Sequence, residues 1–280
     1  MPQAVATGVP DEPTRAAIRR LADDIEQSDG APPLSDQALS HLGSADVAHL
    51  VASDDGRLIG YAQRDGATLE LATEPTAVDL VLDAATSTGT LAWTHGRRSR
   101  LVSAFEARGY VEIRQLHQLR RPLDATHPLP ADPPLADDIV VRAFEPGRDE
   151  QEWLAVNAAA FAHHPEQGDM TLTDLRARMA ESWFDADGFL LAERGDELLG
   201  FHWTKVHADG NGEVYVLGVA PGAQGLGLGN GLLVRGLHHL ERRGCPTVLL
   251  YVDGDNTGAI RLYEKAGFAS YDTDVQWQLS

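Results

Sequence analysis

The chain repeats itself, and this repeat limits the folds that it can adopt more than any other feature of the sequence. Three segments of the first half recur in the same order in the second half, each about 140–160 residues later. The matching pairs are 58–63 with 198–204, 67–75 with 212–221, and 103–123 with 261–279. Such ordered self-similarity predicts two copies of one structural unit.

A proline-rich segment separates the two copies. Residues 122–138 contain five prolines, which exclude a regular helix and a central strand and favour an extended linker. A long surface loop within one domain is the alternative. We expect a first domain over 1–121, a linker over 122–138 and a second domain over 139–280.

Strand and helix patterns alternate along the second copy. The expected strands are 139–143, 188–193, 197–206, 213–219, 247–252 and 274–279, and the expected helices are 147–161, 172–183, 229–243 and 256–266. Gly244 with Pro246, and later Gly267, mark helix ends. This order predicts an α/β fold, in which each domain has a mixed central β-sheet flanked by helices.

The charge of the chain excludes several classes of partner. Its 280 residues carry 23 basic and 42 acidic side chains, a formal net charge of −19. Residues 1–138 hold 12 basic and 21 acidic groups, and residues 139–280 hold 11 and 21. Because no basic half remains, we expect neither nucleic acid nor an anionic membrane surface as a partner.

Other compositional features bear on the compartment. No apolar run approaches the roughly 20 residues of a membrane span, and the N-terminus does not have the pattern of a secretory signal. Cys245 is the single cysteine, so no intrachain disulfide can form. We therefore expect a cytoplasmic protein.

A glycine-rich turn follows the strand that ends at Val219-x-Pro221. It runs from Gln224 to Gly231 and opens a helix. Unpaired backbone N–H groups at the positive end of a helix dipole form a site for phosphate oxygens, and glycines let the backbone approach the anion. The turn has neither the G-K-[ST] of a Walker loop nor the G-x-G-x-x-G of a dinucleotide fingerprint.

The series Gln224-x-x-Gly227-x-Gly229 resembles the acyl-CoA pyrophosphate loop of the GCN5-related N-acetyltransferase (GNAT) family. Downstream, Asn256, Ala259, Tyr263, Gly267 and Phe268 resemble the closing strand–helix motif of that family. A glycine-rich strand-to-helix connection with a structural Asn cap is the alternative. The resemblance implies acetyl-CoA as co-substrate, bound by Leu217, Gly218, Val219, Gln224, Gly225, Leu226, Gly227, Leu228, Gly229, Asn230, Asn256 and Arg261.

A closer resemblance covers nearly the whole chain. The tandem layout and the segments 160–169, 181–188, 198–207 and 212–221 are similar to actinobacterial tandem GNAT enzymes that complete mycothiol synthesis. Those enzymes acetylate the cysteinyl amine of 1-D-myo-inositol 2-(L-cysteinylamino)-2-deoxy-α-D-glucopyranoside. The resemblance implies substrate contacts from Asp36, Glu166, Lys205, Glu213 and Tyr251. Surface salt bridges are the alternative for Glu166 and Lys205.

Two side chains are the candidates for proton transfer. An α-amino group titrates at about 7.7–8.0, so a modest general base suffices to deprotonate it, and Glu213 is our candidate. The resemblance assigns Tyr263 as the acid that protonates the leaving thiolate, and it implies a backbone N–H near Leu217–Val219 that polarises the thioester carbonyl. The alternatives are a solvent-facing strand Glu and a half-buried packing Tyr.

Other reactive residues carry no predicted role. His163 and His164 are adjacent, which is not the spacing of metal ligands, so we expect no metal. Nothing near Cys245 in the sequence resembles a Cys–His nucleophile pair, which argues against an acyl-cysteine intermediate.

The first copy departs from the pattern. It has no Gln-x-x-Gly-x-Gly series, and Asp79 and Asp83 would repel pyrophosphate. We expect it to bind acetyl-CoA poorly or not at all, and to serve as a scaffold. Because each copy already has a partner in the chain, we expect a monomer.

Two other functions remain open from the sequence. One is a GNAT enzyme that acetylates another amine, such as an aminoglycoside or a protein N-terminus, because fold alone does not choose the acceptor. The other is a non-catalytic acyl-CoA-binding module, against which the presence of both Glu213 and Tyr263 argues.

Overall fold

The computed structural model describes residues 2–87, 90–96 and 99–279. Its internal contacts divide the chain into two compact units. Unit 1 comprises the described residues up to 117 together with 253–255 and 272–279, and unit 2 comprises 118–252 and 256–271. Among the described residues, no helix has both the length and the apolar character needed to cross a bilayer.

Unit 1 is built on strands in the order β1-β2-β3-β4-β5-β12. Strands β4 and β5 are parallel, and the other pairs are antiparallel. Its elements are β1 (Gln3–Thr7), α1 (Glu12–Asp29), α2 (Asp36–Ser40), β2 (Ala48–Asp54), β3 (Arg57–Asp65), β4 (Thr68–Thr73), α3 (Val78–Ala85), β5 (Leu91–Thr94), α4 (Leu101–Ala107), the first part of β6 (Tyr110–Pro122) and the last part of β12 (Ala269–Leu279).

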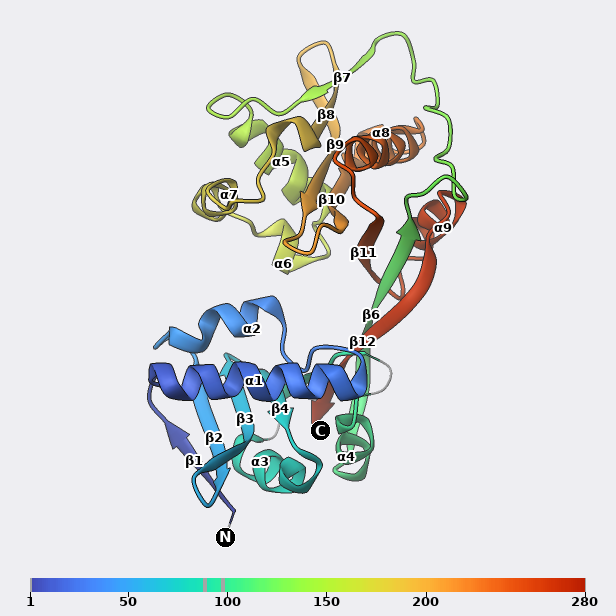
Figure 1. The fold of residues 1–280 in the computed structure, drawn as a ribbon. Coiled ribbons are helices and arrows are strands. Elements are labelled where there is room, and N and C mark those ends of the chain that lie inside the picture. Colours follow the sequence, from blue (N-terminus) through green and yellow to red (C-terminus); the bar gives the residue numbers. More distant parts are fainter. Residues whose placement is uncertain (1, 88–89, 97–98, 280) are drawn as a thin grey trace. The chain divides into compact units, whose positions relative to one another are not determined.

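Side chains that alternate along the strands of unit 1 bury both faces of the sheet. Tyr61 and Ala72 pack with the apolar residues of α1 and α2. Their neighbours Ala62 and Leu71 pack instead with the cluster that includes α3 and α4. Helices therefore cover both sides of the strands (Figure 1).

Unit 2 has the corresponding layout, with strands in the order β6-β11-β10-β9-β8-β7. The parallel pair here is β10 with β11. The elements are β7 (Ile139–Ala143), α5 (Glu150–Ala160), α6 (Pro165–Gly168), α7 (Leu172–Met179), β8 (Phe189–Arg194), β9 (Glu197–Val206), β10 (Gly212–Val219), α8 (Leu228–Arg242), β11 (Thr247–Asp253) and α9 (Thr257–Lys265), with the last part of β6 and the first part of β12.

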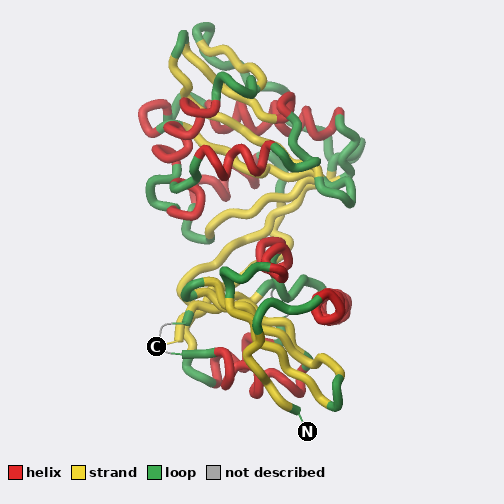
Figure 2. The backbone as a smooth tube through the Cα atoms, turned by 90° about the vertical axis from the view of Figure 1, so that its left-hand side faces the viewer, coloured by secondary structure: helices red, strands yellow, loops and turns green. Residues whose placement is uncertain are grey.

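Two apolar clusters lie on opposite faces of the unit 2 sheet, along which its helices are packed (Figure 2). An aromatic cluster joins Trp153 of α5 to Phe189 and Trp203, whose rings are stacked with centroids 4.4 Å apart. On the other face, Leu233 and Leu237 of α8 pack with β11 and α9. The large rings bury much apolar area, so β9 and β10 are held between rigid layers.

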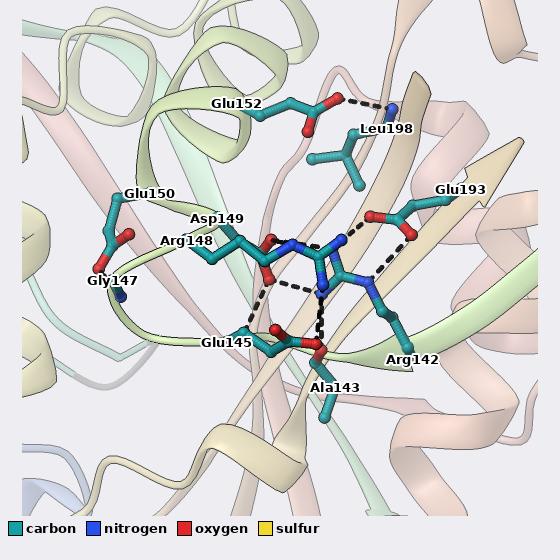
Figure 3. Close-up of polar contacts among 10 residues, drawn as sticks. All are labelled: Arg142, Ala143, Glu145, Gly147, Arg148, Asp149, Glu150, Glu152, Glu193 and Leu198. Atoms are coloured by element: carbon teal, nitrogen blue, oxygen red, sulfur yellow. Dashed lines mark hydrogen bonds and ion pairs between the residues drawn. The ribbon is translucent and has the colours of Figure 1, made fainter. Parts of the chain in front are cut away.

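A partly buried arginine connects β7 to the turn before α5. The Arg142 guanidinium lies between the carboxylates of Asp149 and Glu193 (Figure 3). Its Nη1 and Nη2 donate to Asp149 at 2.5 and 2.8 Å, and Nε donates to Glu193 at 2.9 Å. Burial raises the pKa of Asp149, but hydrogen bonds from Arg142 and from the Glu145 N–H more than offset this and hold the pKa below its usual range.

The division of the structure differs from the predicted boundaries. Residues 118–121 belong to unit 2 and residues 253–255 to unit 1, and two longer segments also change place. Residues 272–279 belong to unit 1, where β12 pairs with β5 from Val275↔Thr94 to Gln278↔Leu91. Residues 122–138 belong to unit 2, although 123–138 contain no helix or strand. This segment packs on α8 through an ion pair of Asp132 with Arg235 at 3.0 Å and a contact of His238 with the Pro130 carbonyl at 3.2 Å.

Three expected elements of the second copy also differ in extent. The helix expected over 147–161 begins at Glu150, because Asp149 is occupied by Arg142 before the first helical turn. The helix expected over 172–183 ends at Met179, and the last strand begins five residues early, at Ala269.

Candidate active site

The candidate site of unit 2 lies where the parallel strands β10 and β11 separate. Their register contains two pairs, Gly212↔Val248 and Glu213↔Leu249, although both strands continue beyond them. A bulge between Val214 and Val216 shifts the pairing of β10 with β9. A bulge re-aims the side chains and N–H groups of its strand, so the predicted polarising segment 217–219 follows directly on this irregularity.

Glu213 sits at the last paired position before the strands separate. Its side chain is 11% exposed, and Oε2 lies 2.8 Å from His207 Nε2. The predicted base is therefore a shielded carboxylate with a hydrogen-bond partner, and not a solvent-facing strand residue.

Lys205 is the register partner of Glu213 on β9. Its Nζ lies over the rings of Trp183 and Tyr215, 5.3 and 5.7 Å from their centroids. The Tyr215 hydroxyl accepts a hydrogen bond from Arg178 Nε at 2.9 Å. A cation over aromatic faces is held by the ring quadrupoles, so Lys205 is oriented by rings. Among the described residues it forms no salt bridge, which was its alternative role.

The glycine-rich loop has the backbone that an anion site needs. Gly225 and Gly227 have φ values of +83° and +77°, the left-handed region that glycine adopts without strain. Among the described residues, the backbone N–H groups of residues 224–230 donate to no backbone carbonyl. The Gly231 N–H is the first after Ala223 that does so, and it bonds to Gly227 O at 3.0 Å. The intervening N–H groups of residues 224–230 lie at the start of α8, where phosphate oxygens are favoured.

The other predicted cofactor contacts lie on β10 and at α9. Leu217, Gly218 and Val219 form the end of β10. Asn256 caps α9, with its side chain accepting from the Ala259 N–H at 3.1 Å, so the structure gives it the capping role that was its alternative. Arg261 is exposed on α9.

Tyr263 faces inward from α9. It is 8% exposed and packs edge-on against Phe268, with ring centroids 5.9 Å apart. Burial raises the pKa of Tyr263 to about 12. Its hydroxyl therefore keeps its proton at neutral pH, as a proton donor must.

The predicted acceptor contacts are distributed over both units. Tyr251 is 45% exposed on β11, and its hydroxyl accepts from Gln118 Nε2 at 2.6 Å. Glu166 lies in α6, but its side chain is outside the described part of the structure. Gln167 beside it exchanges hydrogen bonds with Asn157 of α5 at 2.7 and 2.8 Å, which anchors α6. Asp36 is exposed in the first turn of α2, in unit 1.

Sequence reasoning missed three residues of this site, namely Arg178, Trp183 and His207. Arg178 and Trp183 reach Tyr215 and Lys205 from α7 and the segment after it. His207 reaches Glu213 across a hairpin, since its N–H donates to the Asn211 carbonyl at 2.8 Å. The available signal was the short D-G-N turn between them, which places positions 207 and 213 on adjacent strand ends.

Neither a metal site nor a cysteine nucleophile was expected from the sequence. Among the described residues, no group of three or more His, Cys, Asp or Glu side chains has the arrangement of a metal site. Cys245 is buried, and burial raises the pKa of its thiol. A protonated thiol is a poor nucleophile.

These features match a known class of protein. A model of the acetyltransferase (GNAT) family matches residues 153–268. Two solved structures are similar over nearly the whole chain. One is a GCN5-related N-acetyltransferase from Sphaerobacter thermophilus, with a TM-score of 0.73, 22% identity, and coverage of 98% of this chain and 94% of that one. The other is a tandem GNAT protein from the clavulanic acid biosynthesis pathway, with a TM-score of 0.70, 16% identity, and coverage of 99% and 98%.

Curated relatives are closer in sequence. The chain is 47% identical to a mycothiol acetyltransferase from Streptomyces avermitilis, with 94% of this chain and 90% of the relative covered. It is 46% identical to a mycothiol acetyltransferase from Thermomonospora curvata, with 95% and 94% covered.

The fold and the comparisons define an acetyl-transferring enzyme of the GNAT class with two tandem α/β units, which confirms the predicted fold class. Within that class, the chain belongs to the mycothiol acetyltransferase family. The family predicted from the glycine-rich loop and the closing strand–helix motif is thus confirmed.

Proposed function

We propose that the enzyme transfers the acetyl group of acetyl-CoA to the cysteinyl amine of 1-D-myo-inositol 2-(L-cysteinylamino)-2-deoxy-α-D-glucopyranoside, the last step of mycothiol formation. The names of relatives that cover nearly the whole chain support this acceptor. The observation that carries the chemistry is the shielded carboxylate of Glu213 at the point where β10 and β11 separate.

Glu213 acts as the general base. It takes a proton from the acceptor ammonium, directly or through one water, and the freed amine attacks the thioester carbonyl. The C–N bond forms as the C–S bond breaks. The opposing Lys205 is held over Trp183 and Tyr215, so it contributes positive charge near the base without forming an ion pair that would block it.

The backbone of unit 2 binds and orients the acyl donor. N–H groups of residues 224–230 receive the pyrophosphate, which explains how a chain of net charge −19 binds a polyanion. An N–H of the segment 217–219, beyond the bulge, donates to the thioester oxygen where negative charge develops. Asn256 and Arg261 at α9 add polar contacts at the edge of this path.

Tyr263 protonates the leaving thiolate. A thiol has a pKa near 8.5, whereas burial raises the pKa of Tyr263 to about 12. In isolation the proton transfer is therefore uphill by about 5 kcal/mol, so it assists departure only as the C–S bond breaks and is not essential. The buried ring contact with Phe268 fixes the hydroxyl in place.

Acceptor binding uses residues from both sequence copies. We assign Glu166, Lys205 and Tyr251 to the polyol and cysteinyl groups, with Asp36 as a contact from the first copy. A polyhydroxylated ligand needs several such convergent polar groups. We further propose that unit 1 binds no acetyl-CoA, and that the enzyme works as a monomer in the cytoplasm.

A direct assay tests the proposal. Purified enzyme is incubated with acetyl-CoA and the cysteinyl pseudodisaccharide, and the acetylated product and CoA are quantified by mass spectrometry. Turnover with that acceptor, and not with an aminoglycoside or a peptide N-terminus, is expected. Turnover only with another amine would overturn the acceptor, and acetyl-CoA binding without turnover of any amine would favour a binding module.

The role of the base has its own test. Glu213→Gln is expected to lower kcat by about 10²–10³, most strongly at acidic pH, where the amine carries its extra proton. An unchanged pH–rate profile would remove Glu213 as the base.

A further inference from the structure

One contact of the proposed base is unexplained by the chemistry above. His207 follows the last residue of β9, and its Nε2 lies 2.8 Å from Glu213 Oε2. An ionised carboxylate only accepts hydrogen bonds, so Nε2 carries the hydrogen and donates it. Within the described part of the chain, this is the only side-chain hydrogen bond to Glu213, and it engages one of the two carboxylate oxygens.

The hairpin turn holds the imidazole in that position. The His207 N–H donates to the Asn211 carbonyl at 2.8 Å, and the Gly210 N–H donates back to the His207 carbonyl at 2.9 Å. Asn211 is in turn fixed by Asp209, which accepts from its backbone and side-chain N–H groups at 2.9 and 2.7 Å. The backbone of His207 is therefore anchored on both sides, which fixes the point from which its side chain reaches Glu213.

Burial differs across the pair. The Glu213 side chain is 11% exposed and that of His207 is 25% exposed. A largely buried carboxylate without a hydrogen-bond donor would be costly. The imidazole supplies that donor from the wetter side.

The other charged groups near the pair point elsewhere or act weakly. Lys205 lies over the rings of Trp183 and Tyr215. Burial raises the pKa of Tyr215, and its hydroxyl is occupied by Arg178, with Glu181 a further charge nearby. Hydrogen bonds from Asn211 lower the pKa of Asp209, with a smaller contribution from His207. On β11, Tyr251 follows the register partner of Glu213 by two residues.

We propose that His207 is a positioning residue for Glu213, an inference that rests on the proposed function. By donating to Oε2, it fixes the carboxylate rotamer so that Oε1 faces the acceptor amine.

Two substitutions separate the hydrogen bond from the imidazole ring that supplies it. His207→Gln keeps an N–H donor near the position of Nε2, so kcat at pH 8 is expected to stay within about threefold of wild type. His207→Leu removes the donor and is expected to lower kcat about tenfold to a hundredfold, with little change in KM for acetyl-CoA.

A matched control uses His238 of α8, which contacts the Pro130 carbonyl and Glu241 away from this site. His238→Gln and His238→Leu should leave kcat and its pH profile unchanged. Thermal unfolding of every variant checks the fold. If His207→Leu is unstable, His207→Ala takes its place, with the same loss of kcat expected.

A double-mutant cycle completes the test. Because His207 acts through Glu213, adding His207→Leu to Glu213→Gln should cost less than twofold. Multiplicative losses in the double variant, or a kcat in His207→Gln as low as that in His207→Leu, would overturn the inference. If Glu213→Gln alone leaves kcat unchanged, Glu213 is not the base and the proposed function is contradicted. If Glu213→Gln lowers kcat but His207→Leu does not, only the role of His207 is contradicted.

Discussion

Each unit contains a parallel strand pair that hydrogen-bonds over only two positions, and the two pairs differ in what fills the space beyond. In unit 2, the pairing of β10 with β11 ends at Glu213↔Leu249. In unit 1, the pairing of β4 with β5 ends at Leu69↔Ala92. The very next residue of β4, Glu70, contacts His95, just beyond β5, at 3.3 Å.

A buried network closes the space in unit 1. His95 Nδ1 lies 3.1 Å from Asp274 of β12, and Glu70 accepts from the Ser35 N–H and hydroxyl at 2.6 and 2.8 Å. Burial lowers the pKa of His95, but hydrogen bonds to Asp274 and Glu70 more than offset this and raise it to about 9. A charged, hydrogen-bonded cluster therefore lies beside the parallel pair in unit 1, at the position that corresponds to the acyl-donor path proposed for unit 2.

The strand that should carry the base differs in the same way. Gly60 pairs with Thr73 in unit 1 as Gly200 pairs with Val219 in unit 2. Five residues after that glycine, Asp65 of β3 pairs with Thr68, and Lys205 of β9 pairs with Glu213. Thr68 therefore occupies the position that Glu213 has in unit 2. Strand β4 pairs with β3 without a bulge, whereas β10 contains one between Val214 and Val216.

The two units also differ in the connection that leads from the strand to the next helix and in the residue at the position of Tyr263. Four residues, 74–77, join β4 to α3, whereas eight, 220–227, join β10 to α8. The first turn of α3 contains Asp79, ion-paired with Arg108 at 2.7 Å. The repeat places Phe105 at the position of Tyr263. Unit 1 thus has the same sheet and helices without the residues that we propose for acetyl transfer in unit 2, because packing and chemistry depend on different side chains.

The largest expected effect comes from giving α8 the acidic start of α3. Gly229→Asp places a carboxylate at the second residue of α8, as Asp79 is in α3, and a Cβ there meets Leu262 at an ordinary 3.5 Å. The charge should stabilise the helix slightly yet weaken acetyl-CoA binding about a hundredfold or more by repulsion. Titration calorimetry measures the affinity.

Gly229→Ala is the matched control for that variant, since it adds the Cβ without the charge. It should bind acetyl-CoA within a few-fold of wild type. Equal losses in both variants would mean that space, and not charge, limits the loop. A stoichiometry of two acetyl-CoA per wild-type chain would refute the contrast between the units.

A smaller effect is expected on stability. Because the pKa of His95 is about 9 when folded and near 6.5 when unfolded, its charge stabilises unit 1 fully below about pH 6.5, and this contribution, about 3 kcal/mol, is lost as the pH rises to 9. His95→Gln should lower the free energy of unfolding by about that amount at pH 6.5, with a difference that narrows at pH 9.5. Denaturant unfolding at both values measures this.

Hydrogen exchange assigns the location of that change. Amides of β5 and the end of β12 should lose protection in His95→Gln, while α8 and β10 keep theirs and acetyl-CoA affinity stays constant. His127→Gln, at an exposed histidine in unit 2, serves as the control. A loss of acetyl-CoA affinity in His95→Gln would show that the network supports binding and contradict the comparison.

The smallest effect is expected from replacing Tyr263, the proposed acid of unit 2, by the phenylalanine that unit 1 has at the corresponding position. Tyr263→Phe keeps the ring that packs on Phe268 and removes only the hydroxyl, so kcat should fall about tenfold while stability changes little. Because the pKa of Tyr263 is about 12, the wild-type rate should not decline through its ionisation below about pH 11. Steady-state kinetics across pH 6–10 tests both statements, and an unaffected kcat would leave Tyr263 as packing.

Much of the candidate site follows from contiguous motifs. Glu213, the loop at Gly227 and Tyr263 lie in two short segments whose spacing is visible in the sequence. The residues that escaped prediction, Arg178, Trp183 and His207, meet the site from α7, the segment after it and the far end of a hairpin. Their contacts depend on the path of the chain, which no local pattern records.

The sequence by itself determined the repeated elements, the glycine-rich loop and the family, because strand alternation, helix ends and glycine conformation are set by residues only a few positions apart. Only the tertiary structure decided which strand completes each sheet and what closes the strand pair of unit 1. Asp274 meets His95 across 179 residues of chain. Pairing at that separation is chosen by backbone hydrogen bonds and buried charge, which leave no signature in the neighbouring sequence.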